Sequence, residues 1–306
     1  MSTKAAPRIA RIGLTVGDVE RTQAFYRHAL GFELVEREAR RGPAFEALTG
    51  LAGAKAEVAV LRLGAQEIEL VAFTPAGRGY SGRRAANDPW FQHFAIAVAD
   101  MEQAYAEVLA HGGTPISRGG PELLPPSTGS VTAWKFRDPE GHPLELSLIP
   151  YSAWSEAPAQ PGPGPGPGPG LGIDHTALAV ADLAASKRFY VDLLGFETAG
   201  QGLNRGPEQD ALDGLDGVEL AIAVLRGASD GPHLELLHYL NPASGEAPRQ
   251  PTVNAIASSR TVIACEDLQR LAGKLRAANV AFVSRAATSR FLVRDPDGHL
   301  VELHAA

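Results

Sequence analysis

The sequence predicts an α+β protein built from four βαβββ modules, and three observations support this fold class. A strand-like stretch returns four times, at 11–19, 93–101, 175–183 and 260–268, with spacings of 82, 82 and 85 residues. A helical pattern follows each stretch, and further strand-like runs follow each helix. The two halves also match at a constant offset of 164 residues, as "FYRHALGFE" and "FYVDLLGFE" show. Internal repeats of this kind decide the fold class before any residue chemistry is considered.

The first element of each module is predicted to be a strand with one packed face and one open face. In 93–101 the large residues Phe94 and Ile96 alternate with the small residues Ala95 and Ala97. Successive strand side chains point to opposite faces, so the large residues pack and the small ones line the open face. An Asp then begins each helical pattern, at the N-cap position that Asp favours. The four residues are Asp18, Asp100, Asp182 and Asp267.

The remaining elements of each module are strands, and the last carries a glutamate between apolar neighbours. The runs in the first half are "AEVAVLRLG", "EIELVAF", "VTAWKFRD" and "PLELSLI". In the closing stretch "DPDGHLVELH", Val301 and Leu303 face the core, so Glu302 points to the opposite face. The equivalent residues of the other modules are Glu69, Glu145 and Glu235. A helix covers one face of each small sheet, so the other face must meet something else.

Length and low complexity predict two domains joined by a linker. A chain of 306 residues is too long for one small core, and domains of about 150 residues are expected. The stretch "QPGPGPGPGPGLG" at 160–172 offers neither a ladder of donors nor side chains to bury. We therefore expect a first domain at residues 1–150, a Pro/Gly linker at 151–172 and a second domain at 173–306.

Composition limits the classes of binding partner that we expect for this protein. The net charge of −7 disfavours a phosphate-binding surface, so we expect no nucleic-acid partner. No apolar run reaches membrane-spanning length, and the first residues lack the apolar core of a signal peptide. The single cysteine, Cys265, excludes an intramolecular disulfide and is expected to be a core thiol. We expect a cytoplasmic protein that binds a small molecule.

The open faces combine an Arg or His from the first strand with the Glu of the last strand. The leading residues are Arg11, His93, His175 and Arg260. Imidazole and carboxylate groups are ligands for divalent transition metals. A single strand glutamate is commonly a solvent-facing residue. Four glutamates in register, two of them paired with histidines, favour a ligand set. The two arginines cannot be ligands, because a guanidinium stays protonated and has no lone pair to give.

Two module pairings distribute these residues differently. In consecutive pairing each half of the chain holds one His, two Glu and one Arg. In swapped pairing, of the second module with the third and the first with the fourth, one site contains His93, Glu145, His175 and Glu235. The other pocket then contains Arg11, Glu69, Arg260 and Glu302. We favour consecutive pairing, because sequential units tend to be neighbours. Under either pairing we predict the first set as metal ligands, and we predict that the arginines pair with Glu69 and Glu302.

The stretches "HTALAVADLAASKRFYVDLLGFE" and "DPDGHLVELH" resemble the opening and closing signatures of the vicinal oxygen chelate (VOC) superfamily. This superfamily includes glyoxalase I, methylmalonyl-CoA epimerase, extradiol dioxygenases, and fosfomycin and bleomycin resistance proteins. The resemblance covers nearly the whole chain outside the linker. It implies a tandem two-domain member with the glyoxalase-like fold, in which paired modules form open barrels around a metal.

The resemblance also implies which residues are ligands. His93, Glu145, His175 and Glu235 occupy positions that match ligands of the superfamily, as do Glu69 and Glu302. The first four resemble the His, Glu, His, Glu set of bacterial glyoxalase I. The superfamily usually places His, Gln or Glu where this chain has its two arginines, Arg11 and Arg260.

The function that the resemblance implies is that of a metal-dependent lyase or isomerase of the glyoxalase or epimerase type. Its substrate would be a small molecule with vicinal oxygens, and its cofactor a divalent Zn, Ni, Mn or Fe ion. Glu145 and Glu235 are the candidate catalytic bases. One alternative is an iron-dependent extradiol dioxygenase, which needs two His and one carboxylate. A second is a non-catalytic protein that sequesters a drug, as bleomycin resistance proteins do.

Four further polar residues complete the expectations. His142 and His299, in the two "DPxGH" turns, are predicted to be turn or strand-start residues. Asn204 and Gln209 in "NRGPEQ" lie either near a pocket or in a plain loop.

Overall fold

A computed structural model describes residues 6–80, 84–89, 91–150, 168–228, 231–243, 251–286 and 289–306. The first module comprises β1 (Arg8–Thr15), α1 (Val19–Leu30), β2 (Glu33–Arg41), α2 (Pro43–Thr49), β3 (Lys55–Leu63) and β4 (Gln66–Thr74). The second comprises β5 (Gln92–Val98), α3 (Met101–Ala110), β6 (Thr114–Pro115), β7 (Glu122–Leu123), the 3₁₀ turn η1 (Pro126–Thr128), β8 (Thr132–Arg137) and β9 (Pro143–Leu148).

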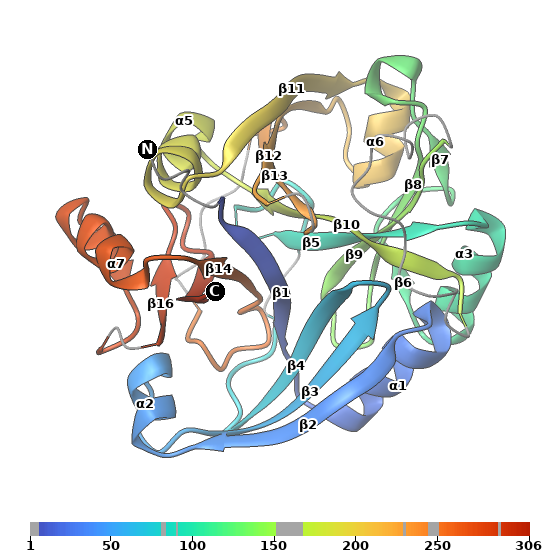
Figure 1. The fold of residues 1–306 in the computed structure, drawn as a ribbon. Helices are drawn as coiled ribbons and strands as arrows, with labels where there is room; N and C mark the ends of the chain where they lie inside the picture. Colours follow the sequence, from blue (N-terminus) through green and yellow to red (C-terminus); the bar gives the residue numbers. More distant parts are fainter. Residues whose placement is uncertain are drawn as a thin grey trace.

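The second half of the chain repeats this order (Figure 1). The third module comprises β10 (Gly170–Ala179), α5 (Leu183–Lys187), its π-helical continuation η2 (Arg188–Leu194), β11 (Glu197–Arg205), α6 (Pro207–Asp213), β12 (Glu219–Arg226) and β13 (His233–Asn241). The fourth comprises β14 (Arg260–Cys265), α7 (Leu268–Ala277), β15 (Ala281–Phe282), β16 (Arg290–Arg294) and β17 (Leu300–Ala305). Most of the predicted linker, residues 151–167, lies outside the described residues, so the domain limits stay a prediction.

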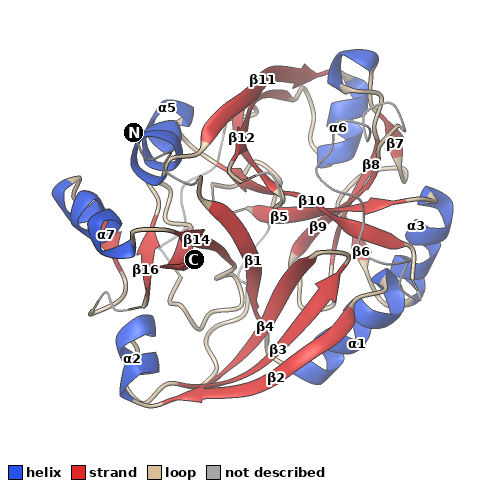
Figure 2. Cartoon of the chain, in the orientation of Figure 1, coloured by secondary structure: helices blue, strands red, loops and turns tan. Residues whose placement is uncertain are grey.

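The strands form two open sheets, and the predicted α+β class is confirmed. One sheet has the order β15-β16-β17-β14-β1-β4-β3-β2. The other has the order β11-β12-β13-β10-β5-β9-β8-β6, with β7 paired to β8. The helices lie toward the periphery and the strands run through the middle of the molecule (Figure 2). None of the helices in the described ranges is long and apolar enough to cross a membrane.

The pairing of modules is swapped, so our preference for consecutive pairing was wrong. The first strand of module one, β1, runs antiparallel to β14 of module four, with Gly13 opposite Arg260. Likewise β5 of module two runs antiparallel to β10 of module three, with His93 opposite Ala177. Each sheet is therefore completed by strands from both halves of the chain.

Consecutive modules are nevertheless neighbours, through their hydrophobic faces. One apolar cluster joins modules one and two and includes Tyr26, Phe94 and Trp134. A second joins modules three and four and includes Tyr190 and Phe291. Figure 1 shows α1 beside α3 on one side of the molecule. Sequential units thus bury their helix-covered faces together, which leaves the edges of their first strands to pair with the other half.

The local predictions for caps and strand faces are confirmed. Oδ1 of Asp18 accepts a hydrogen bond from the backbone N–H of Arg21 at 3.0 Å, and the other three predicted Asp residues cap their helices in the same way. In β17, Leu303 is buried in the hydrophobic cluster of the second half, and Glu302 lies on the opposite face. Cys265 is buried in the same cluster.

The two "DPxGH" turns connect the sheets to each other, which is more than the predicted turn role. Nδ1 of His142 lies 3.0 Å from Oδ2 of Asp138, and its Nε2 lies 3.0 Å from the carbonyl oxygen of Thr15 in the other sheet. Nε2 of His299 lies 2.9 Å from the carbonyl oxygen of Ala179. Both ring nitrogens of His142 face acceptors, so both donate and the ring is an imidazolium. Burial alone would lower the pKa of His142, but Asp138 raises it above 6.5.

We expect this imidazolium to make stability depend on pH. A group whose pKa is raised in the folded state stabilises the fold fully below its unfolded pKa, and the contribution is lost as pH rises through the folded pKa. The free energy of unfolding should therefore fall as pH rises from about 6.5, the ordinary pKa of histidine. His142→Ala should lower the free energy of unfolding by about 3 kcal/mol below that pH, because the buried Asp138 loses its cationic partner.

Urea unfolding at a series of pH values measures both effects. The exposed His28 provides the control, since His28→Ala removes a histidine outside this hydrogen-bond network and should leave the decline attributed to His142 in place. A His142→Gln variant with the same alkaline decline as the wild type would contradict the assignment.

Candidate metal centre and its arginine counterpart

The swapped pairing brings the predicted ligand residues to one cavity, on the open face of the sheet formed by modules two and three. The cavity has a volume of about 280 Å³. His93 from β5, Glu145 from β9, His175 from β10 and Glu235 from β13 all line it. Apolar side chains form other parts of the wall: Leu124, Val131, Leu212, Leu220 and Leu237. The cavity therefore joins an apolar wall to a cluster of nitrogen and carboxylate groups.

His93 is buried and lacks the hydrogen bonds that a buried imidazole needs. Its Nε2 lies 3.5 Å from Oε2 of Glu145, and neither ring nitrogen has a hydrogen-bond partner among the described residues. Burial lowers the pKa of His93, against the opposing effect of Glu145, so the ring is neutral at pH 7. A neutral imidazole with free nitrogens costs energy in a protein interior unless a ligand is bound to it.

His175 is oriented by a neighbouring carboxylate. Its Nδ1 lies 2.9 Å from Oδ2 of Asp174 and donates to it, which leaves Nε2 facing Glu235 at 3.8 Å. Its ring centre lies 5.7 Å from that of His93. Burial alone would lower the pKa of His175, but Glu235 and Asp174 raise it to about 9. A carboxylate behind a histidine is the usual arrangement around a metal ligand, because it fixes the ring and its tautomer.

Glu145 is flanked by a buried lysine that the sequence did not single out. Nζ of Lys135 lies 3.9 Å from Oε2 of Glu145 and 2.6 Å from Oδ1 of the buried Asp213. Burial alone would lower the pKa of Lys135, but Asp213 and Glu145 raise it, so the lysine is cationic. Ser147 donates to Oε1 of Glu145 at 2.8 Å. Burial would raise the pKa of Glu145, but His93 and Lys135 bring it far below its ordinary range. The sequence could have indicated this lysine, because the strand alternation in "VTAWKFRD" places Lys135 on the open face.

Glu235 is the more accessible of the two glutamates. Its Oε1 lies 3.3 Å from Nε2 of His233, which is the cross-strand neighbour of His175. Burial alone would raise the pKa of Glu235, but His175 and His233 lower it to about 2. Asn204 and Gln209 also line the cavity, where Asn204 donates to Gln209 at 3.2 Å, so the pocket alternative for these two residues is correct.

The donor set fits a divalent transition metal. One ligand atom each from His93, Glu145 and His175 lies within 4.8 Å of the others, and Glu235 lies next to this group. A second group within the same limit consists of Asp174, His175 and His233. The unpartnered nitrogens of His93 favour the first group, because Nδ1 of His175 is already bound to Asp174.

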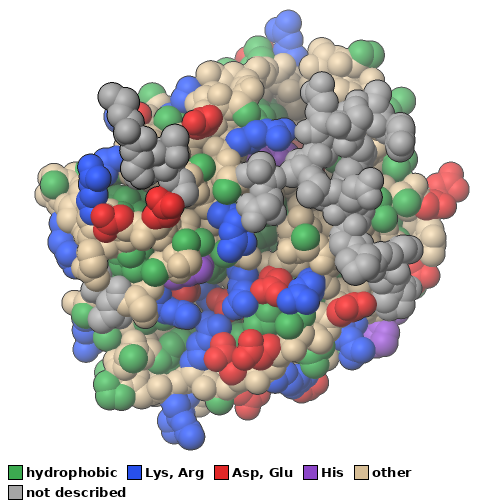
Figure 3. All heavy atoms as spheres, viewed as in Figure 1, with side chains coloured by type: hydrophobic (Ala, Val, Ile, Leu, Met, Phe, Trp, Pro, Cys, Tyr) green, Lys and Arg blue, Asp and Glu red, His purple; other side chains and the backbone are tan. Residues whose placement is uncertain are grey.

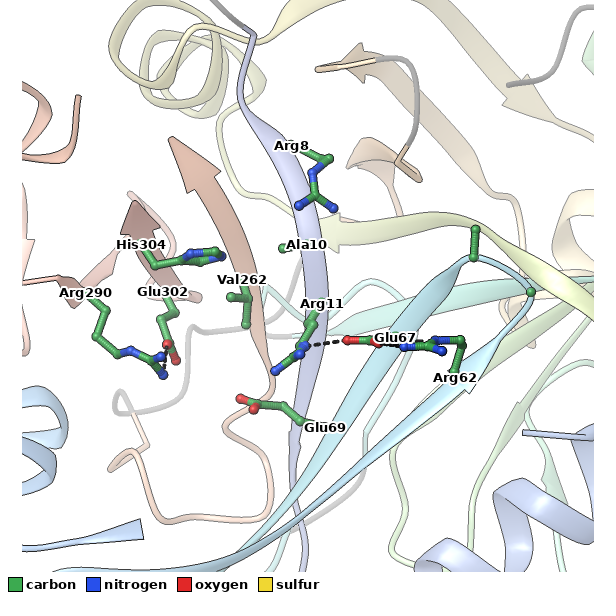
Figure 4. A pocket seen from close by; sticks show the side chains of 12 residues that line it. Arg8, Ala10, Arg11, Arg62, Glu67, Glu69, Val262, Arg290, Glu302 and His304 are labelled. Carbon is green, nitrogen blue, oxygen red and sulfur yellow. Dashed lines mark hydrogen bonds and ion pairs between the residues drawn. The ribbon is translucent and has the colours of Figure 1, made fainter. Parts of the chain in front are cut away.

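The second set of residues forms a different kind of centre, in the sheet of modules one and four. Figure 4 shows three of its members, Arg11, Glu69 and Glu302. The guanidinium of Arg260 contacts Glu69 and also donates through Nε to Oε2 of Glu302 at 3.2 Å. Arg40 donates to Oε2 of Glu69 at 2.7 Å. Burial alone would raise the pKa of Glu69, but Arg260 and Arg40 lower it to about 2. The predicted pairing of Arg260 with Glu69 and Glu302 is confirmed.

The predicted partner of Arg11 was wrong. Arg11 lies opposite Glu67 in the parallel pairing of β1 and β4, and its Nε donates to Oε2 of Glu67 at 2.8 Å. The space between Glu69 and Glu302 is taken by Arg260, so Arg11 bonds to the nearer carboxylate. Its side chain is 33% exposed, whereas that of Arg260 is 4% exposed.

A glycine makes room for the Arg260 guanidinium. A Cβ atom on Gly13 would lie 2.7 Å from Cζ of Arg260, closer than carbon atoms can approach. The residue at the equivalent position in the other sheet is Ala177, which faces His93. Gly13 and Arg260 thus form a matched pair: the missing side chain of one leaves space for the head group of the other.

Comparison with known proteins identifies the family. The sequence profile of the Glyoxalase/Bleomycin resistance protein/Dioxygenase superfamily matches residues 8–146 and 172–303. The chain belongs to this superfamily and is a tandem member of it. The comparison with curated proteins gives no match.

Solved structures share the fold over the whole chain. Glyoxalase I from Zea mays is 20% identical, with a TM-score of 0.61 over 98% of this chain and 92% of that one. A proposed dioxygenase from Bacillus subtilis is 15% identical, with a TM-score of 0.57 over 99% of this chain and 86% of that one. At these identities the likeness concerns the fold alone.

We expect the two arginines to differ in their effect on stability. Arg260→Met should lower the free energy of unfolding by about 3 kcal/mol, because two buried carboxylates lose their shared cation. Arg11→Ala should change it by less than about 1 kcal/mol, because a partly exposed pair contributes little. Thermal and urea unfolding of both variants measure the difference. Equal losses would mean that the buried bridge does not stabilise the fold.

Proposed function

We propose that this protein is a metal-dependent lyase or isomerase of the glyoxalase or epimerase type, acting on a small molecule with vicinal oxygens. The observation that carries the proposal is the buried, unpartnered imidazole of His93 beside Glu145 and His175, inside a cavity. Membership of the superfamily supports the same class of reaction.

The residues that would hold the metal are His93, Glu145, His175 and Glu235. A divalent ion in this position supplies Lewis-acid polarisation of the substrate oxygens. A volume of about 280 Å³ suits a small substrate. The apolar wall of Leu220 and Leu237 would take its carbon skeleton and exclude water around the reacting carbons.

Glu145 and Glu235 are the candidate bases. Both carboxylates are ionised at neutral pH, because neighbouring side chains lower their pKa values: His93 and Lys135 for Glu145, and His175 and His233 for Glu235. An ionised carboxylate at the cavity wall can accept a proton at Oε from one carbon of the substrate and return it to the adjacent carbon. Both groups line the cavity, Glu145 from β9 and Glu235 from β13, so either can be the base.

Lys135 gives the site a fixed positive charge. Proton abstraction next to a carbonyl leaves negative charge on the substrate, and a buried cation stabilises this charge more strongly than one in water. The hydrogen bond of Lys135 to Asp213 holds the ammonium at one position. Together with Ser147 it also limits the motion of Glu145.

Metal content tests whether the histidines share one site. We expect about one divalent ion per chain in protein purified without an affinity tag, and His93→Ala or His175→Ala should each remove most of it. The double variant should lose little more than either single variant, because a shared coordination sphere is already broken. Elemental analysis of the three variants gives the answer, and additive losses would mean two independent sites. If the wild type retains no metal after loading with zinc, nickel, manganese or ferrous iron, the protein is better described as one that sequesters a small molecule.

Substitution of the two glutamates tests the proton transfer. Glu145→Gln and Glu235→Gln preserve shape but remove the basic oxygen, so loss of the true base should lower kcat by about 10² to 10⁴. Exchange of the substrate C–H proton with deuterated water, followed by NMR, reports the step directly. Glu219→Gln makes the same change at an exposed glutamate of β12 that does not line the cavity, and it is the control. Unchanged exchange in both Glu variants would contradict the assignment.

A second candidate function is favoured by one observation. The three-residue cluster of His93, Glu145 and His175 is also the set that an iron-dependent dioxygenase needs. Oxygen uptake by the ferrous protein in the presence of a catechol would support this reaction. Proton exchange without oxygen uptake supports the lyase or isomerase.

A further inference from the structure

A second cavity, larger than that of the candidate metal centre, lies over the arginine-bridged centre and has no role in the proposed reaction. Its volume is about 670 Å³, and it is formed by strands of modules one and four. Figure 3 shows basic and acidic side chains gathered on the face of the molecule that carries β1 and β4. Figure 4 shows Arg8, Arg11, Arg62 and Arg290 around this cavity, with Glu67, Glu69 and Glu302.

The carboxylates of this cavity are already neutralised. Glu67 bonds to Arg11 and Arg62, Glu69 bonds to Arg40 and Arg260, and Glu302 bonds to Arg260 and Arg290. Each glutamate thus has two guanidinium partners. A cation arriving in the cavity would have to displace an arginine from a charge-assisted pair, so a metal ion is disfavoured here.

The guanidinium groups, in contrast, have hydrogen-bonding capacity left. A guanidinium carries five N–H donors. Within the described residues, Arg11 uses one of them, through Nε to Glu67, and Arg290 uses one, through Nη1 to Glu302. In Figure 4 these two side chains approach the cavity from β1 and β16, on either side of β14. Between them the floor is apolar at Val262.

The charge balance of the cavity is positive. Apart from Arg8, five arginines line the cavity or contact its carboxylates: Arg11, Arg40, Arg62, Arg260 and Arg290. The carboxylates are Glu67, Glu69, Glu302 and Glu38, the last bound to Arg40. Five cations against four anions leave an excess of one positive charge in a chain whose net charge is −7. This excess favours an anion over a cation in the cavity.

We propose that this cavity is a metal-independent binding site for a small organic oxyanion, recognised through Arg11 and Arg290. Carboxylate and phosphate groups both match the planar fork of a guanidinium, so they are the shared chemistry of the ligand. The site is separate from the candidate metal centre, which lies in the other sheet. Gly13 and Arg260 give it a rigid base, because the bridge between Glu69 and Glu302 is fixed without a ligand.

Isothermal titration with succinate and with inorganic phosphate, at constant ionic strength set by chloride, tests the site. We expect saturable binding of one anion per chain, and the stronger of the two probes assigns the carboxylate or the phosphate class. Arg11→Ala and Arg290→Ala should each weaken binding at least tenfold. Both side chains are partly exposed, so the variants should fold, and thermal unfolding without ligand verifies this.

Two controls distinguish binding in this cavity from long-range charge attraction and from binding at the metal centre. Arg226→Ala removes an exposed arginine of β12, outside the cavity, and should change the affinity less than twofold. His175→Ala disables the candidate metal centre and should also bind the anion normally. Absence of saturable binding to the wild type would overturn the proposal. So would equal weakening in Arg226→Ala, which indicates long-range charge alone, or loss in His175→Ala, which places the anion in the metal cavity.

Discussion

The antiparallel contact between β5 and β10 is the constraint on which the candidate metal centre depends. These strands are 82 residues apart in the repeat, and only their pairing brings His93 and His175 to one cavity. The last strands, β9 and β13, then run parallel to β5 and β10 and add Glu145 and Glu235 to the same face. In the other sheet, the contact between β1 and β14 brings Arg260 together with Glu69 and Glu302.

Each module contacts its neighbour in sequence and its partner from the other half of the chain through different surfaces. Consecutive modules share hydrophobic clusters, whereas modules from opposite halves share sheets. The buried turn histidines His142 and His299 connect the two sheets. Each histidine precedes a strand of one sheet and lies within hydrogen-bond distance of a carbonyl oxygen in the other sheet.

The sequence predicts what depends on local patterns and fails where the partner is remote. Strand alternation places Glu302 and its three equivalents on the open face, and Asp18 and its equivalents cap helices, since both features depend on residues close in the chain. The preferred module pairing was wrong, because hydrophobic alternation indicates which face of a strand packs but not which strand pairs with its edge. The alternation places Lys135 on the open face, but it does not predict the contact of Lys135 with Asp213, which comes from α6 of another module. The bond of Arg11 to Glu67 depends on cross-strand register, which a repeat alignment does not define.

The two cavities are built from repeats of one module and hold different centres: one offers free imidazole nitrogens, and the other contains its own cation. Anomalous diffraction from crystals of the zinc-loaded protein tests this difference most directly. We predict one strong anomalous peak among His93, Glu145, His175 and Glu235, and none between Glu69 and Glu302, where the Arg260 guanidinium lies. A peak at the arginine bridge, or none beside His93, would contradict this assignment of the two centres.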